Sequence, residues 1–222
     1  MGLRGEITFS ANRRAFRRSA EFDIVIKAVC GPCNHGWLHN LEKAFRALML
    51  NPIHGFPARL SPEEQSIVAV WAIKTWLFLE IAFAHERGGR VISETPRWLR
   101  EHNEPPGYYQ VRLGQVDAEH RQIMWLSTTT VWAQADKPPI GVMGVFHIGN
   151  LLFHIWAPLY GPETRSENLS SLGVGERLAP FFLQVWPNET EEVRWPPSGI
   201  LRLDDLDRLW PPNSNMIIQP AT

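Results

Sequence analysis

Residues 61–85 constrain the fold most, because they predict a long helix that must be buried on nearly every side. Ser61 is a good N-cap residue, and Glu64, three positions later, completes a capping box. The middle of the segment is apolar nearly all round, which is typical of a central core helix or a membrane span. Lys74 and Glu80 interrupt the apolar run. We therefore predict a buried core helix and no membrane association.

A Gly149-Asn150 pair between two β-rich runs predicts a hairpin in the second half of the chain. A two-residue loop there pairs Ile148 with Leu151 and Phe146 with Phe153. The face that carries these four residues must then be core. The opposite face carries His147, His154 and Trp156.

The remaining elements follow from hydrophobic periodicity. Helices are expected from about His35 to Asn51, from Thr95 to before Pro105, and around Asp204–Leu209. Strands are expected over residues 21–29, 108–116, 123–133 and 181–186. Because helices come first and strands second, we predict an α+β protein with a mainly antiparallel sheet.

The charge is balanced overall but uneven along the chain. There are 22 Lys and Arg residues against 23 Asp and Glu residues, which argues against bulk attraction to nucleic acid or membranes. Residues 1–46 nevertheless carry +4, and the remainder carries −5. Such a basic segment is expected of a phosphate-contacting region or of a solvated, frayed N-terminus. The phosphate-contacting candidates are Arg13, Arg14, Arg17 and Arg18.

The two cysteines of the chain, Cys30 and Cys33, form a CxxC motif. This number cannot build a disulfide framework, and no apolar signal-peptide region follows the N-terminal arginines, so we expect a cytoplasmic protein. Two thiolates at this spacing can share one Zn²⁺, which needs four ligands. His35 and His39 follow closely and are candidates to complete the set. A thioredoxin-type redox pair and two inert residues at a turn are the alternatives.

The stretch VCGPCNHGWLHNLE over residues 29–42 resembles a segment of a bacterial HNH-endonuclease-like family. That family carries a CxxCN-x-GW-(M/L)-x-x-LE motif at the end of a zinc-braced ββα-metal (treble-clef) nuclease module. The SPEEQ helix start, the WAIKT run at residues 71–75 and the REH to PP stretch at residues 100–106 are also similar. The resemblance covers roughly residues 20–115.

The resemblance implies phosphodiester hydrolysis on DNA, with roles for several residues of this chain. Cys30, Cys33 and His35 are the implied metal ligands, and Asn34 stands where a neutral His or Asn helps to hold a catalytic Mg²⁺ or other divalent ion. The implied organisation is a partial zinc-knuckle module over residues 1–50 and a helical plus β-sheet domain over residues 51–222 that share one core.

The chain departs from this family pattern before the motif. The family has a second CxxC pair and a general-base His upstream, whereas residues 1–29 contain no Cys and no His. Loss of a general base typically costs a factor of about 10² to 10⁴ in rate. We therefore expect a catalytically incomplete relative, or a chain that starts late relative to its gene.

Two functions of other classes stay open. The first is a non-enzymatic interaction or structural protein, in which exposed aromatic residues form a binding surface or a homo-oligomer interface. The candidates for that surface are Trp125, Trp132, Trp156 and Trp195. The second is a small-molecule pocket centred on His147 and His154, although paired histidines on a strand face are more often packed or hydrogen-bonded.

Overall fold

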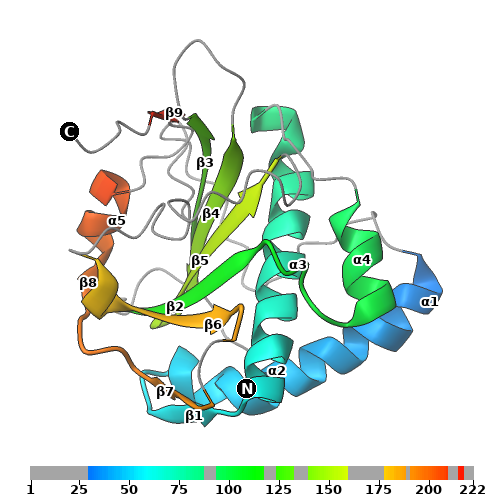
Figure 1. Cartoon of the computed structure of the whole chain (residues 1–222), viewed down its shortest axis with the longest axis horizontal. Helices are drawn as coiled ribbons and strands as arrows, with labels where there is room; N and C mark the ends of the chain where they lie inside the picture. Colours follow the sequence, from blue (N-terminus) through cyan, green and yellow to red (C-terminus); the bar gives the residue numbers. More distant parts are fainter. Residues whose placement is uncertain are drawn as a thin grey trace, which may run out of the picture.

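The computed structural model describes residues 30–87, 94–117, 124–132, 140–159, 178–188, 191–209 and 215–217. The expected strand over residues 21–29 and the four N-terminal arginines, Arg13, Arg14, Arg17 and Arg18, lie outside these ranges. The described part is an α+β fold, with helices on both sides of a mainly antiparallel sheet (Figure 1). The predicted fold class is confirmed.

The helical layer comes first along the chain. It contains α1 (Gly31–Cys33), the helical turn η1 (Asn34–Leu38), α2 (His39–Ile53), α3 (Pro62–Arg87) and α4 (Thr95–His102). The segments α1, η1 and α2 follow one another without a break, so residues 31–53 form one continuous helical rod. The tight turn expected at the CxxC motif is thus the first turn of this rod, and a proline near the start fits that position because its fixed φ suits a first helical turn.

The main sheet has the strand order β6-β2-β5-β4-β3-β9, and β8 pairs with β2. Its strands are β2 (Gln110–Asp117), β3 (Met124–Trp132), β4 (Gly141–Ile148), β5 (Leu151–Pro158), β6 (Phe182–Trp186), β8 (Leu201–Arg202) and β9 (Asn215–Ile217). The β3–β9 and β2–β8 pairs are parallel and the others antiparallel. The β4–β5 hairpin has the predicted register, with Ile148 opposite Leu151 and Phe146 opposite Phe153.

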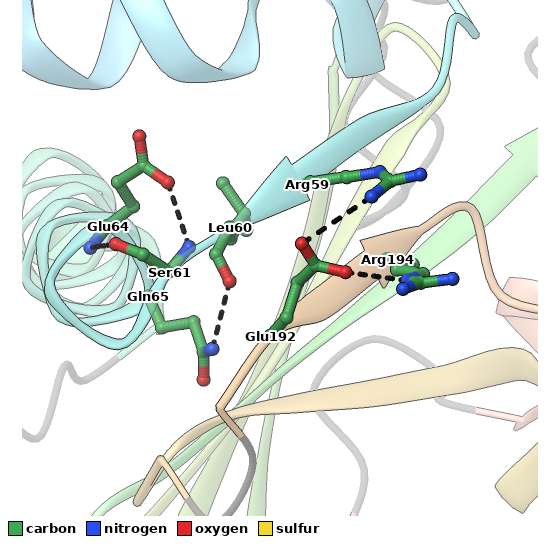
Figure 2. Close-up of polar contacts among 7 residues, drawn as sticks. All are labelled: Arg59, Leu60, Ser61, Glu64, Gln65, Glu192 and Arg194. Atoms are coloured by element: carbon green, nitrogen blue, oxygen red, sulfur yellow. Dashed lines mark hydrogen bonds and ion pairs between the residues drawn. The ribbon is translucent and has the colours of Figure 1, made fainter.

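A second, two-stranded sheet leads into the long helix. Strand β1 (Ala58–Leu60) pairs with β7 (Val193–Trp195), so that Arg59 lies opposite Arg194 and Glu192 forms ion pairs with both (Figure 2). The predicted capping box follows: Glu64 Oε2 accepts a hydrogen bond from the Ser61 backbone N–H at 2.8 Å, and Ser61 Oγ accepts one from the Glu64 backbone N–H at 3.4 Å.

Helix α3 is the centre of the larger core. Residues 68–74 are all buried, around nearly two full helical turns. No helix in the described part of the chain is long and apolar enough to cross a bilayer. Leu41, Phe45 and Met49 of α2 belong to the same apolar cluster as α3 and the inner face of the sheet.

The outer face of the sheet is buried as well, which corrects one prediction. Val145, Leu152 and Trp156 pack in a second cluster with Leu206 of α5 (Leu203–Leu209) and with residues next to the short turn η4 (Ala179–Phe181). Trp156 is therefore only 2% exposed. Trp195 belongs to the larger cluster around α3 and is only 1% exposed, so neither is the exposed binding residue expected from the sequence. The side chains of Trp125 and Trp132 lie outside the described residues.

Candidate functional site

The two cysteines lie at the first turn of the α1–α2 rod. Cys30 is the N-cap residue with an extended backbone (φ −69°, ψ 151°), and its carbonyl oxygen accepts the Asn34 backbone N–H at 3.0 Å. Cys33 falls one helical turn later, which brings both sulfur atoms to one side of the rod. Both thiols are free, Cys30 is exposed and Cys33 is half-buried. A ligand can therefore reach both sulfur atoms from solvent.

A hydrogen bond between the two thiols favours the thiolate form of one of them. A hydrogen bond from the Cys33 thiol lowers the pKa of Cys30 and raises the pKa of Cys33, because the donated proton stabilises the Cys30 thiolate. The positive charge of Arg100 on α4 favours the thiolate form of both residues. The pair therefore favours a thiolate on Cys30 and a thiol on Cys33.

Asn34 and His35 follow the pair and are both exposed. His35 comes two residues after Cys33, a spacing that places two helical side chains on different sides of the rod. Within the described ranges, no three His, Cys, Asp or Glu side chains come close enough together to hold a metal ion. Cys30 and Cys33 thus fit Zn²⁺ as two of its four ligands. The surroundings of Asn34 do not form a Mg²⁺ site within the described residues.

Helix α4 lies beside the thiol end of the rod (Figure 1). Trp37 Nε1 donates a hydrogen bond to Asn103 Oδ1 at 3.0 Å. Asn103 ends α4 in the left-handed conformation, with φ 51°. The stretch 100–106 therefore contacts the Gly-Trp pair of the CxxCN segment, through Asn103 and Trp37.

A second contact joins the rod to α3. Glu42 forms an ion pair with Lys74 and accepts a hydrogen bond from Trp71 Nε1 at 2.8 Å. Burial lowers the pKa of Lys74, and the Glu42 carboxylate partly offsets this effect. The CxxCN segment thus contacts both the WAIKT run and the stretch 100–106 in this fold.

The outward face of the rod carries a stripe of basic side chains, which the sequence reasoning missed. His35, His39, Lys43 and Arg46 are all exposed and recur at intervals of four, four and three residues, so they form one stripe along the helix. Glu42 lies beside them, but its charge is balanced by Lys74. The sequence alone could have revealed this stripe, because a helical projection of residues 31–53 places the four side chains within one quarter of the helix circumference.

The two histidines of the hairpin are core residues. His147 and His154 are both 0% exposed. His147 Nδ1 donates a hydrogen bond to the Gly149 carbonyl at 3.0 Å, and His154 Nε2 lies 3.0 Å from Met143 Sδ. Burial lowers the pKa of His147 to about 4, and burial together with the charge of Arg112 lowers the pKa of His154 to about 3. Their arrangement is the packed, hydrogen-bonded one that such histidines usually adopt.

Comparison of the chain with protein-family models, with curated proteins and with solved structures gave no match.

Proposed function

We propose that this chain is a nucleic-acid-associated protein of the HNH-endonuclease-like class, which contacts phosphate groups through the outward face of the α1–α2 rod. The observation that carries the proposal is the exposed stripe of His35, His39, Lys43 and Arg46. Consecutive members are separated by about 4.5–6 Å of helical rise, so the stripe offers N–H donors to several phosphates at once.

The contacts among the motif segments support the class. Glu42 of the CxxCN segment meets Lys74 and Trp71 of the WAIKT run, and Trp37 of the GW pair meets Asn103. These residues are far apart in sequence but fix the rod on the body of the protein. The thiol end and the basic stripe are therefore held in one orientation.

In this proposal the residues have separate roles. Cys30 and Cys33 bind zinc, Asn34 occupies the position of the catalytic-metal ligand, and the four N-terminal arginines add phosphate contacts. When bound, zinc would brace the first turn of the rod, since metal binding in such sites contributes folding energy. We expect hydrolysis to be absent or very weak, because residues 1–29 provide no histidine to activate water.

Fluorescence anisotropy with a short DNA duplex at several salt concentrations tests the nucleic-acid contact. The wild type should bind with an affinity that falls as salt rises. The double variant Lys43→Gln/Arg46→Gln should make the negative slope of log K against log [salt] shallower by about 2, because two phosphate contacts are lost. The matched control Arg59→Gln/Arg194→Gln removes the same charge from the exposed β1–β7 pair and should leave the slope unchanged.

A plasmid-nicking assay with divalent metal ions tests the placement of Asn34. We expect no cleavage, or weak cleavage that Asn34→Ala abolishes. Strong cleavage that survives Asn34→Ala would show that the hydrolytic site is elsewhere. Absence of any salt-sensitive DNA binding by the wild type would refute the proposed function itself.

A further inference from the structure

The basic stripe of the rod is followed by two exposed apolar side chains. Leu50 comes four residues after Arg46, so it lies on the same face of α2, one helical turn further along. Leu50 is 42% exposed, and Phe56, just beyond the helix, is 61% exposed. Folding leaves both apolar groups in water directly after the last basic member of the stripe. The end of the rod therefore differs chemically from the rest of the stripe.

The way in which α2 ends fixes the position of Phe56. Gly55 has φ +87°, and its backbone N–H donates to the Pro52 carbonyl at 2.9 Å. The Phe56 backbone N–H donates to the Asn51 carbonyl, also at 2.9 Å. These two hydrogen bonds form a Schellman motif, which ends a helix and folds the chain back over its last turn. Phe56 thus returns to the turn of α2 that contains Leu50, and both apolar residues lie at one end of the rod.

The charge of this segment suits a polyanion. Residues 43–57 contain Lys43 and Arg46 and no Asp or Glu, and both basic side chains are exposed. A nucleic acid offers both of the groups that such a segment can bind. Its phosphates suit the basic side chains, and the flat faces of its bases suit an aromatic ring.

A lipid surface fits the same residues less well. A helix that lies in a membrane interface inserts a broad apolar face. The apolar face of α2 is already buried in the protein core, through Leu41, Phe45 and Met49. Along residues 39–57, all of which the structure describes, two large apolar side chains are exposed, and both lie at the end of the rod. This area is small for insertion into a bilayer but matches the face of a single base.

An unpaired base is the most accessible partner for Phe56. In a duplex the neighbouring bases cover each base face, and opening a step costs free energy. A base in a single strand exposes its face without this cost, and it can stack on an aromatic ring. We infer that Phe56 stacks on an unpaired base while Lys43 and Arg46 hold neighbouring phosphates, so that the ligand class is single-stranded nucleic acid. This inference rests on the nucleic-acid role given to the basic stripe under the proposed function.

Fluorescence anisotropy of the full chain with three oligonucleotides of equal length tests the stacking. The probes are a single strand of thymidines, its duplex with the complementary strand, and a single strand that is abasic throughout. The wild type should bind the thymidine strand about 10- to 100-fold more tightly than the abasic strand, because both carry the same phosphates and one lacks bases. Phe56→Ala should remove this difference and leave the salt slope unchanged. Phe56→Tyr keeps the aromatic ring and should retain the difference.

Trp98→Ala is the matched control for loss of an exposed aromatic side chain. Trp98 is 42% exposed on α4, which lies beside the thiol end of the rod, opposite the end that carries Phe56 (Figure 1). This variant should keep the wild-type preference for the strand with bases. Lys43→Gln/Arg46→Gln should weaken binding to both single strands and keep the preference, since it removes phosphate contacts alone.

The outcomes separate this inference from the proposed function. Equal binding of the wild type to the thymidine and abasic strands, still weakened by salt, would overturn the base contact and keep the phosphate-binding role. Tighter binding to the duplex than to the single strand would overturn the single-stranded ligand class. A loss in Trp98→Ala as large as that in Phe56→Ala would overturn the assignment to Phe56. Binding to phosphatidylserine vesicles that Phe56→Ala abolishes, without salt-dependent binding to any oligonucleotide, would refute both proposals.

Discussion

Lys74 is the buried charge on which the attachment of the rod depends. Its side chain is 7% exposed, whereas that of its partner Glu42 is 51% exposed. The two residues are therefore unequal, because Glu42 can face water without its partner and Lys74 cannot. The Lys74 ammonium also lies 5.2 Å from the Trp71 ring centroid, an additional favourable contact.

We predict that Glu42→Gln destabilises the fold more than Lys74→Met does. The amide of Gln keeps an acceptor for Trp71 but leaves the ammonium group without a counter-charge, at a cost of about 2 kcal/mol. Methionine fills the space of the lysine stem, so its cost should stay below about 1 kcal/mol. Urea unfolding of the two variants measures which one lowers the free energy of unfolding more. A larger loss in Lys74→Met would contradict the conclusion that buried Lys74 needs Glu42 more than Glu42 needs Lys74.

A second prediction concerns His147. Its pKa is lowered to about 4 in the folded protein against an ordinary value of 6.5. Between these values the unfolded chain binds a proton that the folded chain does not, so stability falls as pH falls from 6.5 to 4. The loss amounts to about 3 kcal/mol for this residue. Above pH 6.5 it should contribute no pH dependence.

Urea unfolding at a series of pH values measures this loss. His147→Gln removes the titrating group and can still donate to the Gly149 carbonyl, so the pH dependence should become shallower. It should not vanish, because His154 has the same kind of shift. Identical pH profiles for the wild type and His147→Gln would show that the His147 imidazole does not cause the loss of stability at low pH.

At the scale of elements, the β4–β5 turn connects the sheet to the rod. The Asn150 backbone N–H donates to the Ile53 carbonyl at the end of α2 at 3.0 Å, and the Val116 N–H donates to the Asn150 carbonyl at 3.0 Å. Gly149 has φ +55°, and a Cβ atom there would collide with the Ile53 carbonyl. The turn therefore needs glycine for both its backbone conformation and its close approach to α2.

We predict that Gly149→Ala destabilises the protein by about 2–3 kcal/mol, as the sum of left-handed strain and displacement of α2. Gly36→Ala is the control: it lies within the rod, with nothing within 4 Å of the added Cβ. That variant should be neutral or stabilised by up to about 1 kcal/mol, because alanine favours helix. Thermal unfolding of both variants checks the opposite signs. A Gly149→Ala protein as stable as the wild type would contradict the close approach to Ile53.

The sequence predicted the elements that rest on local chemistry. The capping box located the start of α3, and the Gly-Asn pair located the β4–β5 turn with its register. The CxxC pair was also found, but not the basic stripe, because Lys43 and Arg46 were counted by charge and not by helical position. Burial of Trp156 was missed for a different reason. Residues from the range 178–209 bury Trp156, and the hydrophobic periodicity of β5 cannot show that a segment so distant in sequence packs against this strand.

At the scale of the whole molecule, the sheet is shared by two apolar clusters on its opposite faces. Phe146 and Phe153 of the hairpin pack toward α2 and α3, while Val145 and Leu152 pack toward α5. Because β4 and β5 contribute to both clusters, loss of one cluster should also disrupt the other. The segments 30–53 and 191–209, far apart in sequence, should unfold together.

Leu206→Ala tests this coupling, because Leu206 is 0% exposed on α5, on the far side of the sheet from the rod. A cavity there should cost about 2–5 kcal/mol. If the molecule is one cooperative unit, far-ultraviolet circular dichroism, which reports largely on α2 and α3, should shift by the same amount as tryptophan fluorescence. Ile200→Ala, at a 54% exposed neighbouring position, should change the midpoint by less than about 0.5 kcal/mol. A helical signal that keeps its wild-type midpoint in Leu206→Ala would instead mean that the helical layer folds independently of the sheet's outer face.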